Sequence, residues 1–126
     1  MVSIIVVSYE TKDMTVECLR SVVRETDQVT YEVLFIDNDS KDGSFEAIEC
    51  EFGDDPRFLL KKSDVNLGFA AANNELAKHA RGEYILLLNP DTVVLDHAVE
   101  KLIDFARANP GNRIWGGKTV FADGSI

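Results

Sequence analysis

The sequence predicts an α/β fold: a doubly wound, mostly parallel open sheet with helices on both faces. Three observations predict it. Short apolar runs alternate with longer segments of helical periodicity along the whole chain. The runs are apolar at consecutive positions, which is typical of strands buried on both faces of a parallel sheet. Each connection is about 20 residues long, which is enough for one right-handed helical crossover.

Four apolar runs are predicted as strands. In chain order they are Ser3–Ser8, Tyr31–Ile36, Arg57–Lys61 and Glu83–Leu88. A fifth strand is predicted over Arg113–Phe121, followed by a turn at Ala122–Ser125. Because the chain stops after this turn, where a returning strand would be expected, we expect it to be a fragment or to lack a partner segment.

Four helices are predicted between the strands, because apolar residues recur there at spacings of three and four. They are Asp13–Glu25, Ser44–Phe52, Phe69–Ala80 and a last helix from Asp96 to Asn109. The apolar stripe of the first helix contains Met14, Cys18, Leu19, Val22 and Val23. Ser44 and Asp96 are suited to N-cap positions, and Pro110 ends the last helix.

The composition excludes several classes of protein. The chain has 13 lysines and arginines against 22 aspartates and glutamates, a net charge of −9, so nucleic-acid binding is not expected. No apolar run approaches the roughly 18–20 residues of a membrane span, and no basic residue precedes the first apolar run, so no signal peptide is predicted. Two cysteines, Cys18 and Cys50, are too few for a disulfide scaffold and are predicted as reduced thiols in the core. These features fit a cytoplasmic protein.

Polar residues follow all four predicted strands, and the carboxyl ends of parallel strands meet at one edge of a sheet. These segments are Ser8–Thr11, Asp37–Ser44, Ser63–Phe69 and Asn89–Thr92. Turns and caps account for any one of them. Together they bring Asp37, Asp39 and Asp91 to the same edge, where close carboxylates favour a divalent cation. Mg2+ or Mn2+ held by one or two carboxylates also binds phosphates, so a diphosphate ligand is predicted.

Other sites for phosphate or catalysis are absent from the sequence. The chain has no P-loop, no GxGxxG after the first strand, no zinc-ligand spacing and no GxSxG elbow, and His79 and His97 are isolated. An alternative function is a receiver-like signalling module with an acidic magnesium-binding edge. That module needs an acidic pair after its first strand, where this chain has only Glu10. A purely structural α/β domain leaves the acidic edge unexplained.

Four sequence blocks occur in a familiar order, at residues 3–10 (SIIVVSYE), 36–44 (IDNDSKDGS), 66–74 (NLGFAAANN) and 82–92 (GEYILLLNPDT). With them the chain resembles the N-terminal, nucleotide-sugar-binding half of family 2 glycosyltransferases, whose GT-A fold is Rossmann-like. The last two blocks most resemble rhamnosyltransferase-type members. The resemblance covers nearly the whole chain and implies that residues 1–126 form one nucleotide-sugar-binding domain, truncated before the acceptor half.

The resemblance also implies which residues contact a UDP- or dTDP-linked sugar. The segment that lines the base and ribose corresponds to Val7, Ser8, Tyr9 and Glu10. The pair that contacts the pyrimidine base corresponds to Asp37 and Asn38. The loop beside the nucleotide corresponds to Gly68 and Phe69, although the Phe69 ring itself is expected in the core, because it begins an apolar helical stripe.

Asp91 corresponds to the last acid of the DxD motif, which binds the Mg2+ or Mn2+ that carries the diphosphate; Asn89 and Pro90 precede it. Three positions depart from the family pattern: Glu10 stands where Asn is more frequent, Asn38 where Asp is common, and Asn89 in place of the first acid of DxD. Asp91 is therefore the one metal ligand that the resemblance predicts.

The resemblance implies transfer of the sugar to an acceptor hydroxyl, with inversion, in polysaccharide biosynthesis. The acceptor would be a glycan or a lipid-linked glycan, so the whole enzyme could lie at a membrane surface. The catalytic base of the family lies beyond the DxD motif, so no residue of this chain is predicted to be catalytic. The chain alone is expected to bind the nucleotide and to turn over little or nothing.

Overall fold

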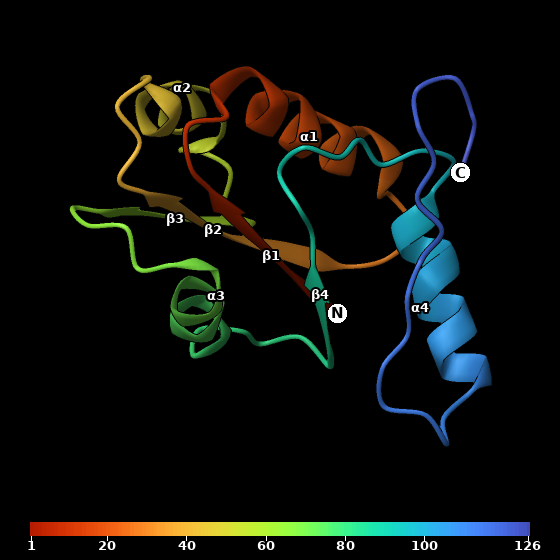
Figure 1. The fold of residues 1–126 in the computed structure, drawn as a ribbon. Coiled ribbons are helices and arrows are strands. Elements are labelled where there is room, and N and C mark those ends of the chain that lie inside the picture. Colours follow the sequence, from red (N-terminus) through yellow and green to blue (C-terminus); the bar gives the residue numbers. More distant parts are fainter.

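The computed structural model describes residues 1–126 and confirms the α/β fold (Figure 1). Its elements in chain order are β1 (Val2–Ser8), α1 (Lys12–Glu25), β2 (Tyr31–Asn38), α2 (Ser44–Phe52), β3 (Phe58–Ser63), α3 (Phe69–Ala77), β4 (Tyr84–Leu87) and α4 (Ala98–Ala108). All four strands are parallel, in the order β3-β2-β1-β4. The helices α1 and α2 cover one face of the sheet and α3 covers the other, so the sheet is doubly wound.

The core lies on both faces of the two central strands. β2 is buried at every position and β1 at all but one, because each strand has a neighbour on both sides and helices above and below. On the larger face, one buried cluster joins residues of α1, α2 and α4 to residues of the central strands, Phe35 among them; on the smaller face, Leu76 of α3 belongs to a cluster with Ile5 and Leu34. The edge strands β3 and β4 are half-exposed, so some of their apolar side chains contact solvent.

Several helices begin or end at other residues than predicted, because the backbone conformation at those residues determines where a helix can start and stop. Ser44 does not cap α2: Gly43, with φ of 81°, is the cap residue, and Asp42 accepts hydrogen bonds from the Ser44 amide and hydroxyl. The helix α4 does not begin at Asp96, because Asp96 and His97 both adopt left-handed φ values (49° and 54°), which no helix continues through. The helix α3 ends at Ala77 rather than at residue 80.

The predicted strand Arg113–Phe121 is wrong. These residues form no strand, because none of them pairs with the backbone of the sheet, and a strand exists only where a neighbour supplies donors and acceptors. Instead Trp115 packs edge-on against Tyr84 of β4, with ring centroids 6.0 Å apart. The predicted turn is present: Phe121 donates to the Ser125 carbonyl, and Gly124 donates back to Phe121.

Two core predictions for helices were wrong. Cys18 is buried as predicted, but Cys50 is exposed on α2, and Met14 is 56% exposed on α1. Both lie inside the predicted helices but face away from the sheet. None of the four helices has the length and apolar character that a membrane crossing requires.

Candidate functional site

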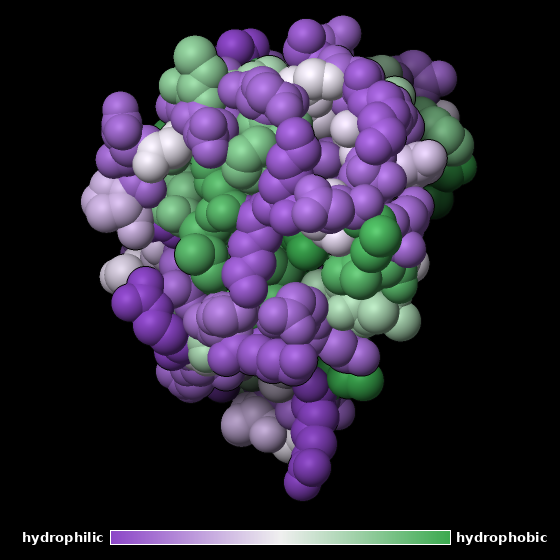
Figure 2. All heavy atoms as spheres, turned by 90° about the vertical axis from the view of Figure 1, so that its left-hand side faces the viewer, coloured by the Kyte–Doolittle hydropathy of each residue, from purple (hydrophilic) through white to green (hydrophobic).

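The carboxyl ends of the strands form the edge on the left of Figure 1, which faces the viewer in Figure 2. Ser8 ends β1 opposite Asp37 of β2, and Asn38 lies opposite Ser63 of β3. Figure 2 shows a surface that is mainly hydrophilic, with an apolar area between the polar side chains. The fold therefore brings the four polar segments to one edge of the sheet, as the parallel topology predicts.

Asp37 is the buried carboxylate of this edge. Its side chain is 0% exposed at the end of β2. One oxygen, Oδ2, accepts a hydrogen bond of 3.0 Å from the Ser40 amide, whereas Oδ1 is buried and has no partner. An unpaired buried oxygen is costly to a fold, and such groups are rare. Oδ1 is therefore a hydrogen-bond acceptor that no donor of the chain satisfies.

Asn38, the next residue, holds the loop that enters α3. Its Nδ2 donates to Asn66 Oδ1 at 2.9 Å and to the Gly68 carbonyl at 3.4 Å, and its Oδ1 accepts from the Leu67 amide at 2.7 Å. Gly68 has φ of 79°, a conformation that favours glycine. Asn38 therefore positions the predicted nucleotide loop, a function that is additional to its predicted contact with the base.

The segment after β1 is tied to the segment after β2. The Glu10 amide donates to Ser40 Oγ at 2.8 Å, and Glu10 Oε1 accepts from the Lys41 amide at 2.6 Å. Glu10 adopts φ of 54° to make these contacts, which leaves the neighbouring Tyr9 ring half-exposed above the edge. Val7 is half-buried and Ser8 fully buried beneath them. The predicted base-and-ribose segment is thus a fixed part of the edge.

Two lysines of this edge, Lys41 and Lys62, are already paired, whereas Lys12, whose Nζ lies near Gly43, forms no ion pair. Lys41 Nζ lies 2.7 Å from Asp39 Oδ1, and this hydrogen bond raises the pKa of Lys41. Lys62 Nζ lies 2.8 Å from Glu46 Oε1, which raises the pKa of Lys62 in the same way. Both lysines stay protonated, but each is neutralised by a neighbouring carboxylate. Lys12 alone does not balance the charge of a diphosphate, so a metal ion would supply the remaining countercharge at this edge.

Asp91 offers the ligand chemistry that such an ion needs. It is exposed in the segment after β4, and none of the ion pairs or side-chain hydrogen bonds of the chain uses its carboxylate. The neighbouring Asn89 carbonyl is occupied, since it accepts from the Thr92 amide and hydroxyl. One free carboxylate completed by phosphate oxygens and water suits Mg2+ or Mn2+.

The predicted grouping of Asp37, Asp39 and Asp91 as metal ligands is not formed. Asp37 turns toward the Ser40 amide and Asp39 toward Lys41, so the three carboxylates do not gather within ligand distance. One group of three potential ligands does come within 4.8 Å: Asp27, His97 and Glu100. This group lies at the opposite edge, where Glu100 Oε1 accepts from the Asp27 and Gln28 amides at 2.7 Å and so closes the loop before β2.

Phe69 does not lie in the core as expected, because its side chain is 59% exposed at the start of α3. We therefore expect Phe69→Ala to change the free energy of unfolding by less than about 0.5 kcal/mol. Leu76→Ala, in the same helix but at a fully buried position, should cost about 2–5 kcal/mol. Urea unfolding followed by circular dichroism compares the two variants, and a loss for Phe69→Ala as large as that for Leu76→Ala would restore the core assignment.

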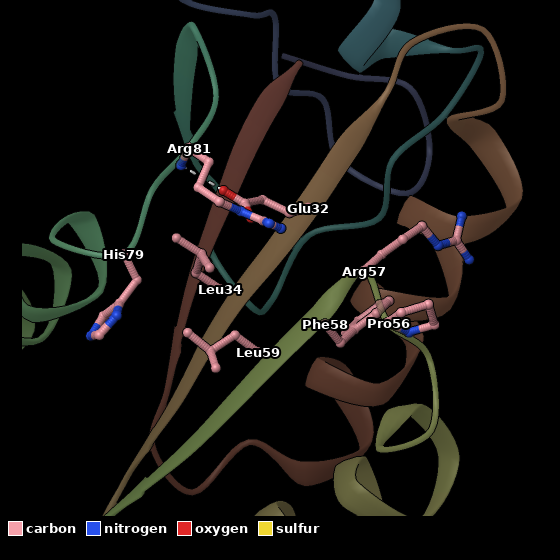
Figure 3. Close-up of a pocket in the computed structure, with 8 residues that line it drawn as sticks. All are labelled: Glu32, Leu34, Pro56, Arg57, Phe58, Leu59, His79 and Arg81. Carbon is pink, nitrogen blue, oxygen red and sulfur yellow. Dashed lines mark hydrogen bonds and ion pairs between the residues drawn. The ribbon is translucent and has the colours of Figure 1, made fainter.

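A separate hollow of about 260 Å³ lies at the opposite end of the strands (Figure 3). Leu34 and Leu59 form its floor, and Glu32 is paired with Arg81 at its rim. Both oxygens of Glu32 are occupied by hydrogen bonds within the chain. The hollow therefore belongs to the architecture of the amino edge and not to the candidate site.

Sequence reasoning missed the residues that hold the site in place. Ser40 and Asp42 join the first two loops, and Ser21 of α1 accepts a hydrogen bond of 2.8 Å from the Val94 amide. Cys18, predicted only as a core residue, donates to the Asn89 carbonyl with a distance of 3.6 Å between Sγ and the oxygen. Burial raises the pKa of this thiol to about 11, so it remains a donor. For Ser21 the sequence did contain a signal, because it is a polar residue among the apolar residues of the first predicted helix.

The chain matches a known protein family and is similar in sequence to several known proteins. The family described as "Glycosyl transferase family 2" matches residues 3–124. Glycosyltransferase GlyG of Streptococcus pneumoniae is 29% identical over 102 residues, which are 81% of this chain and 34% of that protein. The Escherichia coli glucosyltransferase WfgD, described as UDP-Glc:alpha-D-GlcNAc-diphosphoundecaprenol beta-1,3-glucosyltransferase, is 28% identical over 127 residues, 100% of this chain and 49% of that protein. The chain thus spans a third to a half of these relatives.

Two solved structures share the fold. The mannosyltransferase PcManGT from Pyrobaculum calidifontis, in complex with GDP-Man and Mn2+, superposes with a TM-score of 0.76 at 24% identity, over 83% of this chain and 32% of that one. TarS of S. aureus, residues 1–349 with UDP-GlcNAc, gives a TM-score of 0.74 at 22% identity, over 85% of this chain and 31% of that one.

Proposed function

Since the chain belongs to glycosyl transferase family 2, we propose that it is the part of a glycosyltransferase that binds a nucleotide-diphosphate sugar. The donor is UDP- or dTDP-linked, and it lies at the carboxyl edge of the sheet. Because this family matches nearly the whole chain, the receiver-like signalling module is no longer proposed as an alternative. The predicted compartment stays the cytoplasm.

The unpaired Oδ1 of Asp37 carries this proposal. Uracil and thymine each present one ring N–H, at N3, and a carboxylate only accepts hydrogen bonds. A base placed with its N3–H on Oδ1 would satisfy the one buried carboxylate oxygen of the edge that lacks a partner. Cytosine has an acceptor at N3, so it cannot make this contact through its ring. The UDP-GlcNAc bound to TarS fits a uridine nucleotide, whereas PcManGT holds GDP-Man, whose guanine also presents a ring N–H.

Asp91 is proposed to hold Mg2+ or Mn2+ at the diphosphate, in line with the Mn2+ in the PcManGT complex. When bound, the metal acts as a Lewis acid that stabilises the leaving diphosphate. The residues of this chain bind and orient the donor: Asp37 and the segment Val7–Glu10 at the base and ribose, Gly68 beside the nucleotide, and Asn89 and Pro90 ahead of Asp91.

The sugar is then transferred to a hydroxyl of a glycan or a lipid-linked acceptor, with inversion. A carboxylate on the opposite face of the sugar must take the acceptor proton in such a reaction. We assign this base to none of the residues 1–126. The isolated chain is therefore expected to bind the donor and to transfer little or no sugar.

Calorimetric titration of the chain with UDP and dTDP, in Mn2+ and in EDTA, tests the proposal. We expect binding that Mn2+ strengthens, and Asp91→Ala should lower the affinity in Mn2+ by at least about tenfold, to the level in EDTA. Asp104→Ala, at an exposed aspartate on α4, is the control and should bind as the unmodified chain does. Nucleotide binding that is absent, or that ignores the metal, would overturn the proposal.

A further inference from the structure

The helix α1 has three buried polar side chains on the face that meets the sheet. Thr15, Cys18 and Ser21 are each 0% exposed and follow one another at three-residue spacing. The buried stripe of an amphipathic helix is ordinarily apolar. Each of the three reaches out of the helix: Thr15 toward Ser8, at 3.4 Å between the hydroxyl oxygens, and the other two toward the segment after β4.

The segment that follows β4, residues 89–94, has no helix or strand to hold it. Two contacts with α1 fix it, one at each end. Cys18 Sγ donates to the Asn89 carbonyl, and the Val94 amide donates to Ser21 Oγ at 2.8 Å. Val94 itself is only 5% exposed, so its amide has no access to water as an alternative partner. Asp91 lies between these two anchors.

Ser21 is the stronger anchor. Its hydroxyl donates to the Cys18 carbonyl at 2.6 Å while it accepts from the Val94 amide. The first hydrogen bond orients the oxygen, so that its lone pair faces Val94. Alanine at this position would leave the buried Val94 N–H without a partner. A buried unpaired N–H costs more free energy than the loss of a hydrogen bond exposed to water, so the segment would shift to relieve that cost.

We infer that Ser21, supported by Cys18, is a positioning residue that sets where the Asp91 carboxylate lies at the carboxyl edge of the sheet. This inference depends on the proposed function, because the carboxylate is placed for the metal ion of a nucleotide sugar. Groups that orient a metal ligand from behind typically change metal affinity by about ten- to a hundredfold when they are removed.

The experiment compares Ser21→Ala with Ser3→Ala. Ser3 is equally buried, and its hydroxyl also donates one hydrogen bond and accepts another, to Glu32 and from the Gly82 amide, but at the opposite edge. UDP affinity is measured in Mn2+ and in EDTA. We expect Ser21→Ala to reduce the gain in affinity that Mn2+ provides by about tenfold or more, with the affinity in EDTA unchanged. Ser3→Ala should leave both affinities unchanged.

Hydrogen exchange of the backbone amides gives a second readout that needs no metal. In Ser21→Ala the Val94 and Thr92 amides should exchange faster, while the amides of β1 keep their protection. Cys18→Ala, which removes the weaker anchor, should shift both readouts in the same direction by less, and it serves as the test if Ser21→Ala does not fold.

The outcomes separate the two proposals. If the unmodified chain shows no metal-dependent binding of UDP, the proposed function fails, and this inference fails with it. Two results would overturn the inference alone, provided that the unmodified chain shows metal-dependent binding of UDP. In one, Ser21→Ala keeps the full gain in UDP affinity from Mn2+; in the other, Ser21→Ala loses UDP affinity equally in Mn2+ and in EDTA. A loss for Ser3→Ala equal to that for Ser21→Ala overturns it as well, since general destabilisation would then explain both.

Discussion

Asp37→Asn is expected to lower nucleotide affinity by about ten- to a hundredfold with little change in the stability of the chain. Asparagine has the same shape and keeps an oxygen for the Ser40 amide, which now pairs with Oδ2. The atom in the place of Oδ1 becomes an NH2 group, which meets the N3–H of uracil donor to donor. A hydrogen bond to a charged partner contributes about 1.5–3 kcal/mol, so UDP affinity should fall by about ten- to a hundredfold.

Stability should change little, because the native carboxylate is buried with one oxygen unpaired. Asparagine removes the cost of the buried charge but leaves a buried NH2 group without a partner, so the free energy of unfolding should change by less than about 1 kcal/mol. Calorimetric titration with UDP and urea unfolding measure the two effects on the same protein. A loss of binding without a loss of stability distinguishes a functional carboxylate from one that serves the fold.

Asp39→Asn is the matched control, since Asp39 lies two residues away and pairs with exposed Lys41. It should bind UDP within about twofold of the unmodified chain, because a surface ion pair contributes little. If Asp37→Asn instead binds UDP normally and loses stability, the assignment of Oδ1 to the base is wrong.

The fold could be predicted from the sequence where the relevant property is local. β1 and β2 are apolar at consecutive positions, and that pattern predicts strands of a parallel sheet. The pattern does not predict which strands are central, because β4 shows it too and lies at the edge. The region Arg113–Phe121 also contains apolar residues, but a strand depends on a neighbour elsewhere in the chain, which no local pattern contains. The predicted start of α4 differs from the observed one for a similar reason, because the left-handed conformations of Asp96 and His97 depend on how that loop is folded.

The candidate site divides in the same way. The place of Asp37 and Asp91 at one edge follows from topology, which the alternation of strands and helices predicts. Which carboxylate oxygen is free depends on the turn that brings the Ser40 amide to Oδ2. The partner of Asn38 at Asn66 lies 28 residues along the chain. Such pairings are properties of the folded chain, so the sequence predicted the residues of the edge better than their individual tasks.

A second large effect is expected at the amino edge, where Glu32 joins three separate parts of the chain. Its carboxylate is 4% exposed and accepts hydrogen bonds from Ser3 Oγ (2.7 Å), the Arg81 amide (2.8 Å) and Arg81 Nε (2.8 Å). The loop before β4 comes so close that a side chain at Gly82 would lie 2.6 Å from the Ser3 amide nitrogen. Glu32 of β2 therefore ties the loop that precedes the edge strand β4 to β1 and β2 (Figure 3).

Glu32→Ala should lower the free energy of unfolding by about 2–4 kcal/mol, because it leaves the buried Ser3 hydroxyl without an acceptor and the part-buried Arg81 amide without a partner. The Arg81 side chain is 71% exposed, so its charge returns to water and adds little to this cost. Glu32→Gln keeps the shape and one acceptor oxygen and should lose less. Arg81→Ala, which leaves the Ser3 contact and the backbone contact intact, is the control and should cost about 1 kcal/mol or less.

The same carboxylate makes stability depend on pH. Burial alone would raise the pKa of Glu32, but the hydrogen bonds from the Arg81 amide, Ser3 and the Arg81 guanidinium outweigh it and hold the pKa below its ordinary value of 4.5. The unfolded chain therefore takes up this proton more readily than the folded chain. The stabilisation by Glu32 is complete above pH 4.5 and is lost as the pH falls through the lower, folded-state pKa. Urea unfolding between pH 7 and pH 3 should show a steeper decline for the unmodified chain than for Glu32→Gln; equal slopes would mean that the Glu32 carboxylate does not stabilise the fold through its charge.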